Sequence, residues 1–205
     1  MPGRQQTDPA PSLRERKRER TRRALVAAAA KLFARKGYDE TTVAEIAAAA
    51  EIGTRTFFSY FANKDDVLFP DSDARVRATL AAIADRDPAE RPVDVLVRAL
   101  AAAAEDDADL VGPMAAVRTR LARTVPAVRG KALHVQMDGQ REIVRALTEA
   151  YPELDRVDAA ALTGALTGAV GAALDVLMED EDAEPAALRA RLRKATDLAL
   201  RPWRD

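Results

Sequence analysis

The chain has 205 residues, of which 48% are hydrophobic and 32% are charged, and its formal net charge is −1. It contains no cysteine and a single histidine, so disulfides and thiolate chemistry are excluded, and no His-rich set of zinc ligands can form. We find no apolar run of the roughly 18 residues that a membrane span requires. These features predict a cytoplasmic protein with no metal, no cofactor and no membrane partner.

The charges are distributed unevenly. Residues 1–64 hold 13 basic and 7 acidic side chains, whereas residues 65–205 hold 19 and 26, so the two net charges are +6 and −7. A basic N-terminal segment followed by an acidic remainder indicates a protein that binds phosphate groups at one end. The alternative is that these charges only solvate helix faces.

A long helix is the first predicted element. Residues 1–12 contain three prolines and few apolar side chains, which predicts a disordered tail. From Arg14 to Lys36, apolar residues recur at three- and four-residue spacing. Gly37 follows, where a helix C-terminus favours a left-handed residue.

Two short helices are predicted next. Thr41 or Thr42 can cap a helix, with Glu45 at the third or fourth position as a partial capping box. A third helix is expected to run from residue 53 or 54 to Tyr60, with Phe57 and Phe61 facing inward. Neither short helix is stable alone, so both must pack on the long first helix.

The remainder of the chain is predicted to be helical as well. Asn63 is expected to cap a fourth helix that begins at Lys64, breaks at Pro70 and resumes to about residue 85. Later helices are predicted at about residues 92–106, 109–123, 126–150, 155–179 and 185–201. No segment alternates with period two for long enough to form a strand, so we expect an all-α fold of about nine helices.

The three N-terminal helices resemble the helix-turn-helix domain of the TetR family of bacterial transcriptional regulators. The resemblance covers residues 20–69 and is carried by the motifs LFARKGYDETTV, AEIAAAAEIGTRTFFSYF and NKDDVL. It implies a DNA-binding domain at residues 13–63, after the tail at 1–12, and a ligand-binding and dimerisation domain at 64–205. The DNA contacts that it implies are Thr42, Thr54, Arg55, Thr56, Phe58, Ser59, Tyr60 and Lys64.

Roles can be assigned to some of these residues. Thr54 and Arg55 are the best candidates for base readout, because a guanidinium can bind guanine through two parallel hydrogen bonds. Thr42 and Lys64 are expected to hold phosphates at helix N-termini. The arginines and lysines at the start of the first helix could join them, or could be a solvated face.

Three positions depart from the family pattern. Glu51 stands where the family usually has a turn glycine, and a left-handed glutamate would be strained by about 1 kcal/mol. Gly53 replaces the usual Ser or Thr cap, which weakens the cap by only a few tenths of a kcal/mol. Phe58 replaces a tyrosine and loses its hydroxyl, so its phosphate contact is in question.

The resemblance also implies a ligand cavity among the helices of the second domain. Most apolar residues there are expected to be core, and flexible methionines suit an adaptable apolar wall. The residues predicted to line the cavity are Leu96, Leu100, Met114, Val117, Arg118, Leu121, His134 and Met137. For His134, a surface or satisfied core position is the alternative.

The last two helices are expected to form a two-fold dimer interface. Glycines at 164, 168 and 171 lie within one predicted helix, and glycine costs about 0.8–1 kcal/mol there relative to alanine, so a close helix approach is implied. The alternative is that this small face packs within the monomer. The apolar contacts predicted for the dimer are Leu162, Leu166, Val170, Leu174, Leu188 and Leu192.

The sequence thus predicts a repressor that binds a palindromic operator as a homodimer and is released by a small, hydrophobic effector. An enzyme on a helical scaffold is the first alternative, but a glycine-rich phosphate loop and a metal-spaced cluster are both lacking. The second alternative is a helical adaptor that binds protein and not DNA.

Overall fold

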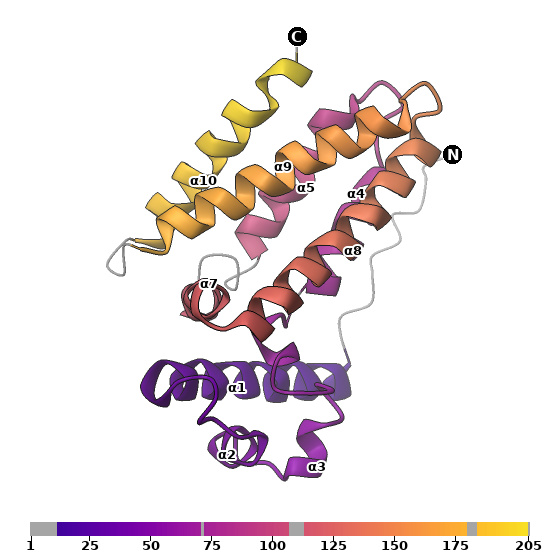
Figure 1. Cartoon of the computed structure of the whole chain (residues 1–205). Coiled ribbons are helices and arrows are strands. Elements are labelled where there is room, and N and C mark those ends of the chain that lie inside the picture. The colour runs from indigo at the N-terminus through magenta and orange to yellow at the C-terminus, as the bar shows by residue number, and fades with distance from the viewer. Residues whose placement is uncertain (1–11, 71, 107–112, 180–183, 205) are drawn as a thin grey trace. The chain divides into compact units, whose positions relative to one another are not determined.

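The computed structural model describes residues 12–70, 72–106, 113–179 and 184–204, and over these residues every regular element is a helix (Figure 1). The all-α prediction is confirmed. The predicted tail, apart from Ser12, lies outside the described residues. The chain divides into two compact units between Val67 and Leu68.

The first unit contains the three predicted helices, α1 (Leu13–Lys36), α2 (Val43–Ala49) and α3 (Thr54–Phe57). Glycine at 37 follows α1 with φ 87°, a left-handed conformation that favours this residue, as predicted. The helices meet through large apolar side chains that are at most 1% exposed, and this apolar contact supplies the stability that two short helices lack. These side chains are Leu25, Phe33, Ile46 and Phe57.

The segment after α3 differs from the prediction. Instead of a helix from Lys64, the chain forms a short 3-10 helix, η1 (Asp66–Leu68), and α4 begins only at Ser72 and ends at Ala84. Asn63 is a cap, as expected, but of this turn: its Oδ1 accepts from the backbone N–H of Asp66 at 2.9 Å. Pro70 explains the break, because proline disfavours helical backbone at the residue before it.

Over the described residues, the second unit contains α4 and five further α-helices. These are α5 (Pro92–Asp106), α7 (Pro113–Thr124), α8 (Pro126–Ala150), α9 (Arg156–Leu177) and α10 (Pro185–Leu200), followed by the 3-10 helix η2 (Arg201–Trp203). Helix α9 lies between α8 and α10 (Figure 1). Four of the five helices begin with proline, whose missing N–H is unneeded at a first position. The predicted helix start at 109 lies outside the described residues.

The core of the second unit joins residues distant in sequence. Leu96 from α5, Leu147 from α8, Leu162 from α9 and Leu200 from α10 lie in one buried cluster. A second, smaller cluster at the other end of α9 and α10 contains Leu177, Leu188 and Leu192. Each helix thus buries one apolar stripe, as expected of a helical domain.

Helix α9 corrects one expectation from the sequence. It is long and apolar enough, by length and composition only, to cross a membrane, whereas we had expected no such segment. The expectation failed because α9 is rich in alanine and glycine, so the helix is apolar on average although it contains no long run of large hydrophobic side chains. Its Ala159, Leu162 and Leu166 pack in the core described above, but only 22% of the apolar window is buried within the chain.

Candidate nucleic-acid interface

The start of α2 is fixed by a complete capping box. The Thr42 hydroxyl oxygen accepts from the backbone N–H of Glu45 at 3.2 Å, and Glu45 Oε2 accepts from the backbone N–H of Thr42 at 2.9 Å. The second oxygen of Glu45 pairs with Lys36 Nζ of α1 at 2.5 Å. The Lys36 hydrogen bond, followed by those from Thr42, lowers the pKa of Glu45 to about 2. The predicted cap is therefore confirmed, and it also joins α2 to α1.

A tight turn connects α2 and α3. The backbone N–H of Ile52 donates to the carbonyl of Ala47 at 3.0 Å, and Glu51 takes φ 57°. Glu51 is the one non-glycine residue with positive φ among those that the structure describes. The departure from the family's glycine therefore falls on a left-handed position, which costs a residue with a side chain about 1–2 kcal/mol. Gly53 then begins α3 without a side-chain cap.

Helix α3 is shorter than predicted but keeps the expected division of faces. It ends at Phe57 rather than Tyr60, because the backbone tightens into i→i+3 bonds: Tyr60 N–H donates to the Phe57 carbonyl at 2.9 Å. Phe57 and Phe61 are buried, as predicted, with ring centroids 5.7 Å apart. The side chains left on the surface are Thr54, Arg55, Thr56, Phe58 and Ser59, with Tyr60 half-buried.

The environment of Lys64 differs from the one predicted from the sequence. Its Nζ donates to the backbone carbonyls of Tyr38 at 2.9 Å and Thr41 at 3.3 Å, and it stands 4.1 Å from the centroid of the Tyr38 ring. It precedes η1 and does not start a helix, so the expected helix N-terminus is absent there. The ammonium group ties the α1–α2 corner to the segment after α3. Lys64 therefore has a structural role in addition to any contact with DNA.

The basic start of α1 makes contacts that the sequence analysis missed. The Arg18 guanidinium lies over the Tyr60 ring at 5.3 Å from the centroid, and that of Arg22 over Phe61 at 5.7 Å. A capping box at Ser12 and Glu15 extends the helix to this region. The four-residue spacing of Arg18 and Arg22 could have predicted that both side chains lie on one helix face, since residues at i and i+4 share a face.

The residues predicted to line a ligand cavity separate into two groups. Leu96, Met114, Val117 and Leu121 are buried, and Leu100 and Arg118 are half-buried. Arg118 donates to the backbone carbonyl of Leu68 at 3.1 Å. His134 and Met137 instead lie on the surface.

The exposure of His134 and Met137 has a simple origin in α8. His134 pairs with Asp138 one turn later at 3.1 Å, and the Met137 side chain is 50% exposed. Both residues project from the outer side of the helix, whereas Ile143 and Leu147 face the core. Within the chain, neither His134 nor Met137 can share an interior cavity with the buried group.

The residues predicted for the dimer interface are mostly interior. Leu162 and Leu166 of α9, and Leu188 and Leu192 of α10, are buried within the chain, whereas Val170 and Leu174 are half-buried. The four leucines belong to the core of the chain. The exposed apolar surface of α9 is made instead by Val157 and Val176 near its two ends and by small residues between them, among them Ala160, Ala161, Gly168, Gly171 and Ala172.

Among the described residues, no side chain or neighbouring backbone packs closely against the glycines of α9. A Cβ atom added at Gly164, Gly168 or Gly171 would meet nothing within 4 Å. The three glycines therefore do not support the alternative that this small face packs inside the monomer, although Ala165 and Ala173 of the same helix do pack against the core clusters of the chain.

Taken together, the capped α2, the tight turn and the exposed α3 define a helix-turn-helix protein with a separate helical second unit. Residues 25–69 match the family described as bacterial regulatory proteins, tetR family. The N-terminal unit of the chain thus carries the sequence of this family's DNA-binding domain.

One relative and two solved structures are similar to the chain over longer stretches. TcmR, an HTH-type transcriptional regulator of Streptomyces glaucescens, is 37% identical over 131 residues, which are 63% of this chain and 58% of TcmR. The match thus spans less than two thirds of that relative. A TetR-family regulator structure from Syntrophomonas wolfei is 16% identical, with 89% of this chain and 96% of that chain covered and a TM-score of 0.60.

The second structure carries a ligand. It is Thermus thermophilus FadR, a TetR-family transcriptional repressor in complex with lauroyl-CoA, at 22% identity and a TM-score of 0.55, covering 87% of this chain and 93% of that chain. At these identities the two structures establish the shared fold.

Proposed function

We propose that the chain is a dimeric transcriptional repressor that binds a palindromic operator through α3 and is released by a small, hydrophobic effector. The observation that carries the proposal is the exposed triplet Thr54, Arg55 and Thr56 on a short helix whose apolar side is anchored in the first unit. A major groove about 12 Å wide admits one such helix.

The first unit supplies the DNA contacts in this proposal. Thr54 and Arg55, at the exposed start of α3, read base edges, while the neighbouring Thr56, Phe58 and Ser59 contact sugar, phosphate and thymine methyl groups. Thr42 fixes the register through the N-terminus of α2, whose first-turn amides attract a phosphate. Lys64 contributes positive charge, so replacing it weakens the binding of all DNA sequences alike. Part of that effect is structural, because Lys64 also donates hydrogen bonds to the carbonyls of Tyr38 and Thr41.

The second unit supplies the dimer contact. The proposed interface is the exposed small-residue face of α9, flanked by Val170 and Leu174. Glycines at 164, 168 and 171 leave room for a partner helix backbone to approach closely, which offsets their low helix propensity. This interface also accounts for an apolar helix that is mostly uncovered within the chain, and it supports a cytoplasmic protein rather than a membrane span.

The effector is proposed to be hydrophobic and to bind among the buried residues of α5 and α7. Leu96 of α5 and Met114, Val117 and Leu121 of α7 are buried apolar side chains, and the proposal is that an acyl chain or a similar group inserts beside them. The lauroyl-CoA complex of the FadR structure is consistent with this ligand class on the same fold. An effector changes DNA affinity only through its difference in affinity for two conformations of the protein.

Binding to random-sequence duplex DNA over a salt series tests the DNA-binding part. A helix-turn-helix protein releases counterions on binding, so the logarithm of its affinity falls steeply and linearly with the logarithm of salt concentration. A helical adaptor would show no such dependence. Binding that is absent at low salt, or insensitive to salt, would overturn the proposed function.

A further inference from the structure

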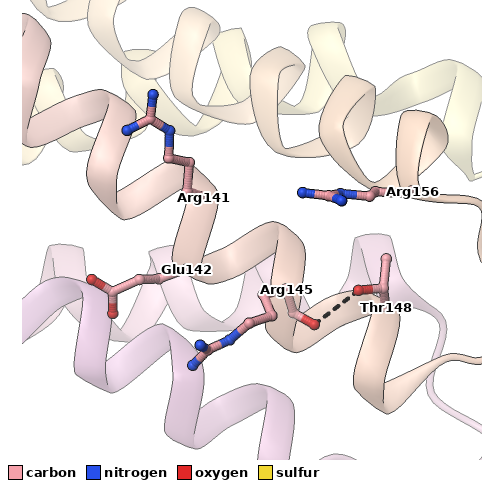
Figure 2. Close-up of a pocket in the computed structure, with 5 residues that line it drawn as sticks. All are labelled: Arg141, Glu142, Arg145, Thr148 and Arg156. Atoms are coloured by element: carbon pink, nitrogen blue, oxygen red, sulfur yellow. Dashed lines mark hydrogen bonds between the residues drawn. The ribbon is translucent and has the colours of Figure 1, made fainter.

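A hollow of about 540 Å³ lies on the surface of the second unit, between the C-terminal half of α8 and the start of α9. It is lined by Arg141, Glu142, Arg145, Thr148 and Arg156 (Figure 2). This volume falls within the roughly 300–1,000 Å³ typical of small-molecule sites. Three of the five lining residues are arginines, so the charge of the lining is +2.

The arginines come from two helices. Arg141 and Arg145 are one turn apart on α8, where the Cβ atoms of such a pair lie about 5–6 Å apart. Arg156 is the first residue of α9 and extends toward α8 (Figure 2). Like charges at this spacing repel one another, so an anion placed among them relieves the repulsion.

Most hydrogen-bond donors of these arginines are unused within the described part of the chain. Arg141 makes one contact with Asp138 at 3.3 Å, and Arg145 one with Glu149 at 3.7 Å. All of these side chains are largely exposed, which makes both pairs weak. Arg156 forms no ion pair with a carboxylate among the described residues.

Two neighbouring groups define what the hollow can bind. Asp155 caps α9 by accepting from the backbone N–H of Val157 at 2.7 Å, so the helix N-terminus is already occupied by a carboxylate. The Thr148 hydroxyl donates to backbone carbonyls of its own helix, 2.9 Å away at Arg145. The guanidinium groups are therefore the donors left for a ligand, and their fork geometry matches phosphate.

We propose that the hollow between α8 and α9 binds a small molecule that carries phosphate groups. The site is separate from α3 and goes beyond the proposed repressor function. Glu142 also lines the hollow, so its negative charge opposes the binding of an anion.

Isothermal titration of the full-length chain with sodium pyrophosphate at low ionic strength tests the proposal. We expect saturable binding that weakens about three- to tenfold in each of Arg141→Gln, Arg145→Gln and Arg156→Gln, since each removes one charge-assisted contact. Glu142→Gln should strengthen binding. Arg129→Gln, an exposed arginine of α8 outside the hollow, is the matched control and should leave the affinity unchanged.

Several outcomes would overturn the proposal. These are the absence of saturable binding, equal weakening by Arg129→Gln, and a triple arginine variant that loses affinity for DNA while still binding pyrophosphate. DNA affinity in the same variants separates the two proposals, because a failed phosphate site leaves DNA binding intact. The arginines are exposed, so folding is expected to survive and is checked by far-UV circular dichroism.

Discussion

The guanidinium of Arg18 lies over the ring of Tyr60, 5.3 Å from its centroid. This contact joins the first turns of α1 to the segment that follows α3, and Arg22 makes a similar contact with Phe61. The basic start of α1 and the predicted DNA contact at Tyr60 therefore belong to one surface.

Replacing Arg18 by glutamine should weaken DNA binding for two reasons, the loss of a positive charge and the loss of the contact that orients Tyr60. Arg16→Gln removes the same charge from an exposed neighbour and is the control. Fluorescence anisotropy should give a larger loss for Arg18→Gln, by about 0.5–1 kcal/mol, the contribution of an exposed cation–π contact. Equal losses would mean that Arg18 acts through its charge alone.

Replacing Glu51 by glycine should stabilise the first unit by about 1 kcal/mol, because the strain of a side chain at φ 57° is removed. Hydrogen exchange of the amides in α1 to α3 measures the stability of this unit separately from the second. Glu51→Ala, which keeps the strain and removes the carboxylate, should give no such gain. A gain in both variants would assign the effect to the carboxylate.

The ion pair and capping box at Glu45 predict a dependence on acidic pH. The pKa of Glu45 is about 2 in the folded chain, below the ordinary value of 4.5. Its contribution to stability is therefore fully present above pH 4.5 and is lost as the pH falls toward 2. In the Glu45→Gln variant, the free energy of unfolding, measured by urea unfolding followed by circular dichroism, should depend less on pH in this window than in the wild type.

The control for that experiment is Glu40→Gln, which removes another exposed carboxylate close by in sequence. It should retain the pH dependence of the wild-type chain. If the Glu45→Gln curve has the same slope as the wild type between pH 2 and 4.5, the assignment of the acid-sensitive contact to Glu45 is incorrect.

Gly168→Ala distinguishes close helix packing between subunits from simple helix propensity. Within one chain the added methyl group meets nothing within 4 Å, so the helix should gain about 0.8–1 kcal/mol. At a close helix–helix interface the same methyl group should weaken the dimer. Analytical ultracentrifugation is expected to give weaker dimerisation for Gly168→Ala, and unchanged dimerisation for the exposed α8 control Ala127→Gly.

Local chemistry explains which features could be predicted from the sequence. The capping box of Thr42 and Glu45 and the burial of Phe57 and Phe61 depend on residues only three or four positions apart, and each was predicted. The end of α3 at Phe57 was not, because short helices end according to their tertiary packing rather than propensity.

Long-range contacts explain the remainder. Lys64 reaches the carbonyls of Tyr38 and Thr41, more than 20 positions away in sequence, which no local pattern encodes. In α9, leucine and alanine positions are both apolar, so periodicity alone could not tell that Leu162 and Leu166 face the core while Gly168 faces outward. Only the packing of α8 and α10 against α9 decides this.

Selection of binding sites from a random duplex library by the full-length chain tests the central claim most directly. A dimer that reads DNA with two α3 helices should enrich a palindrome whose half-sites are one helical turn, about 34–36 Å, apart. Arg55→Ala should bind that palindrome with roughly 1–3 kcal/mol less discrimination at one base pair of each half-site. Enrichment of no sequence, or of a site that Arg55→Ala reads as well as the wild type, would contradict the account.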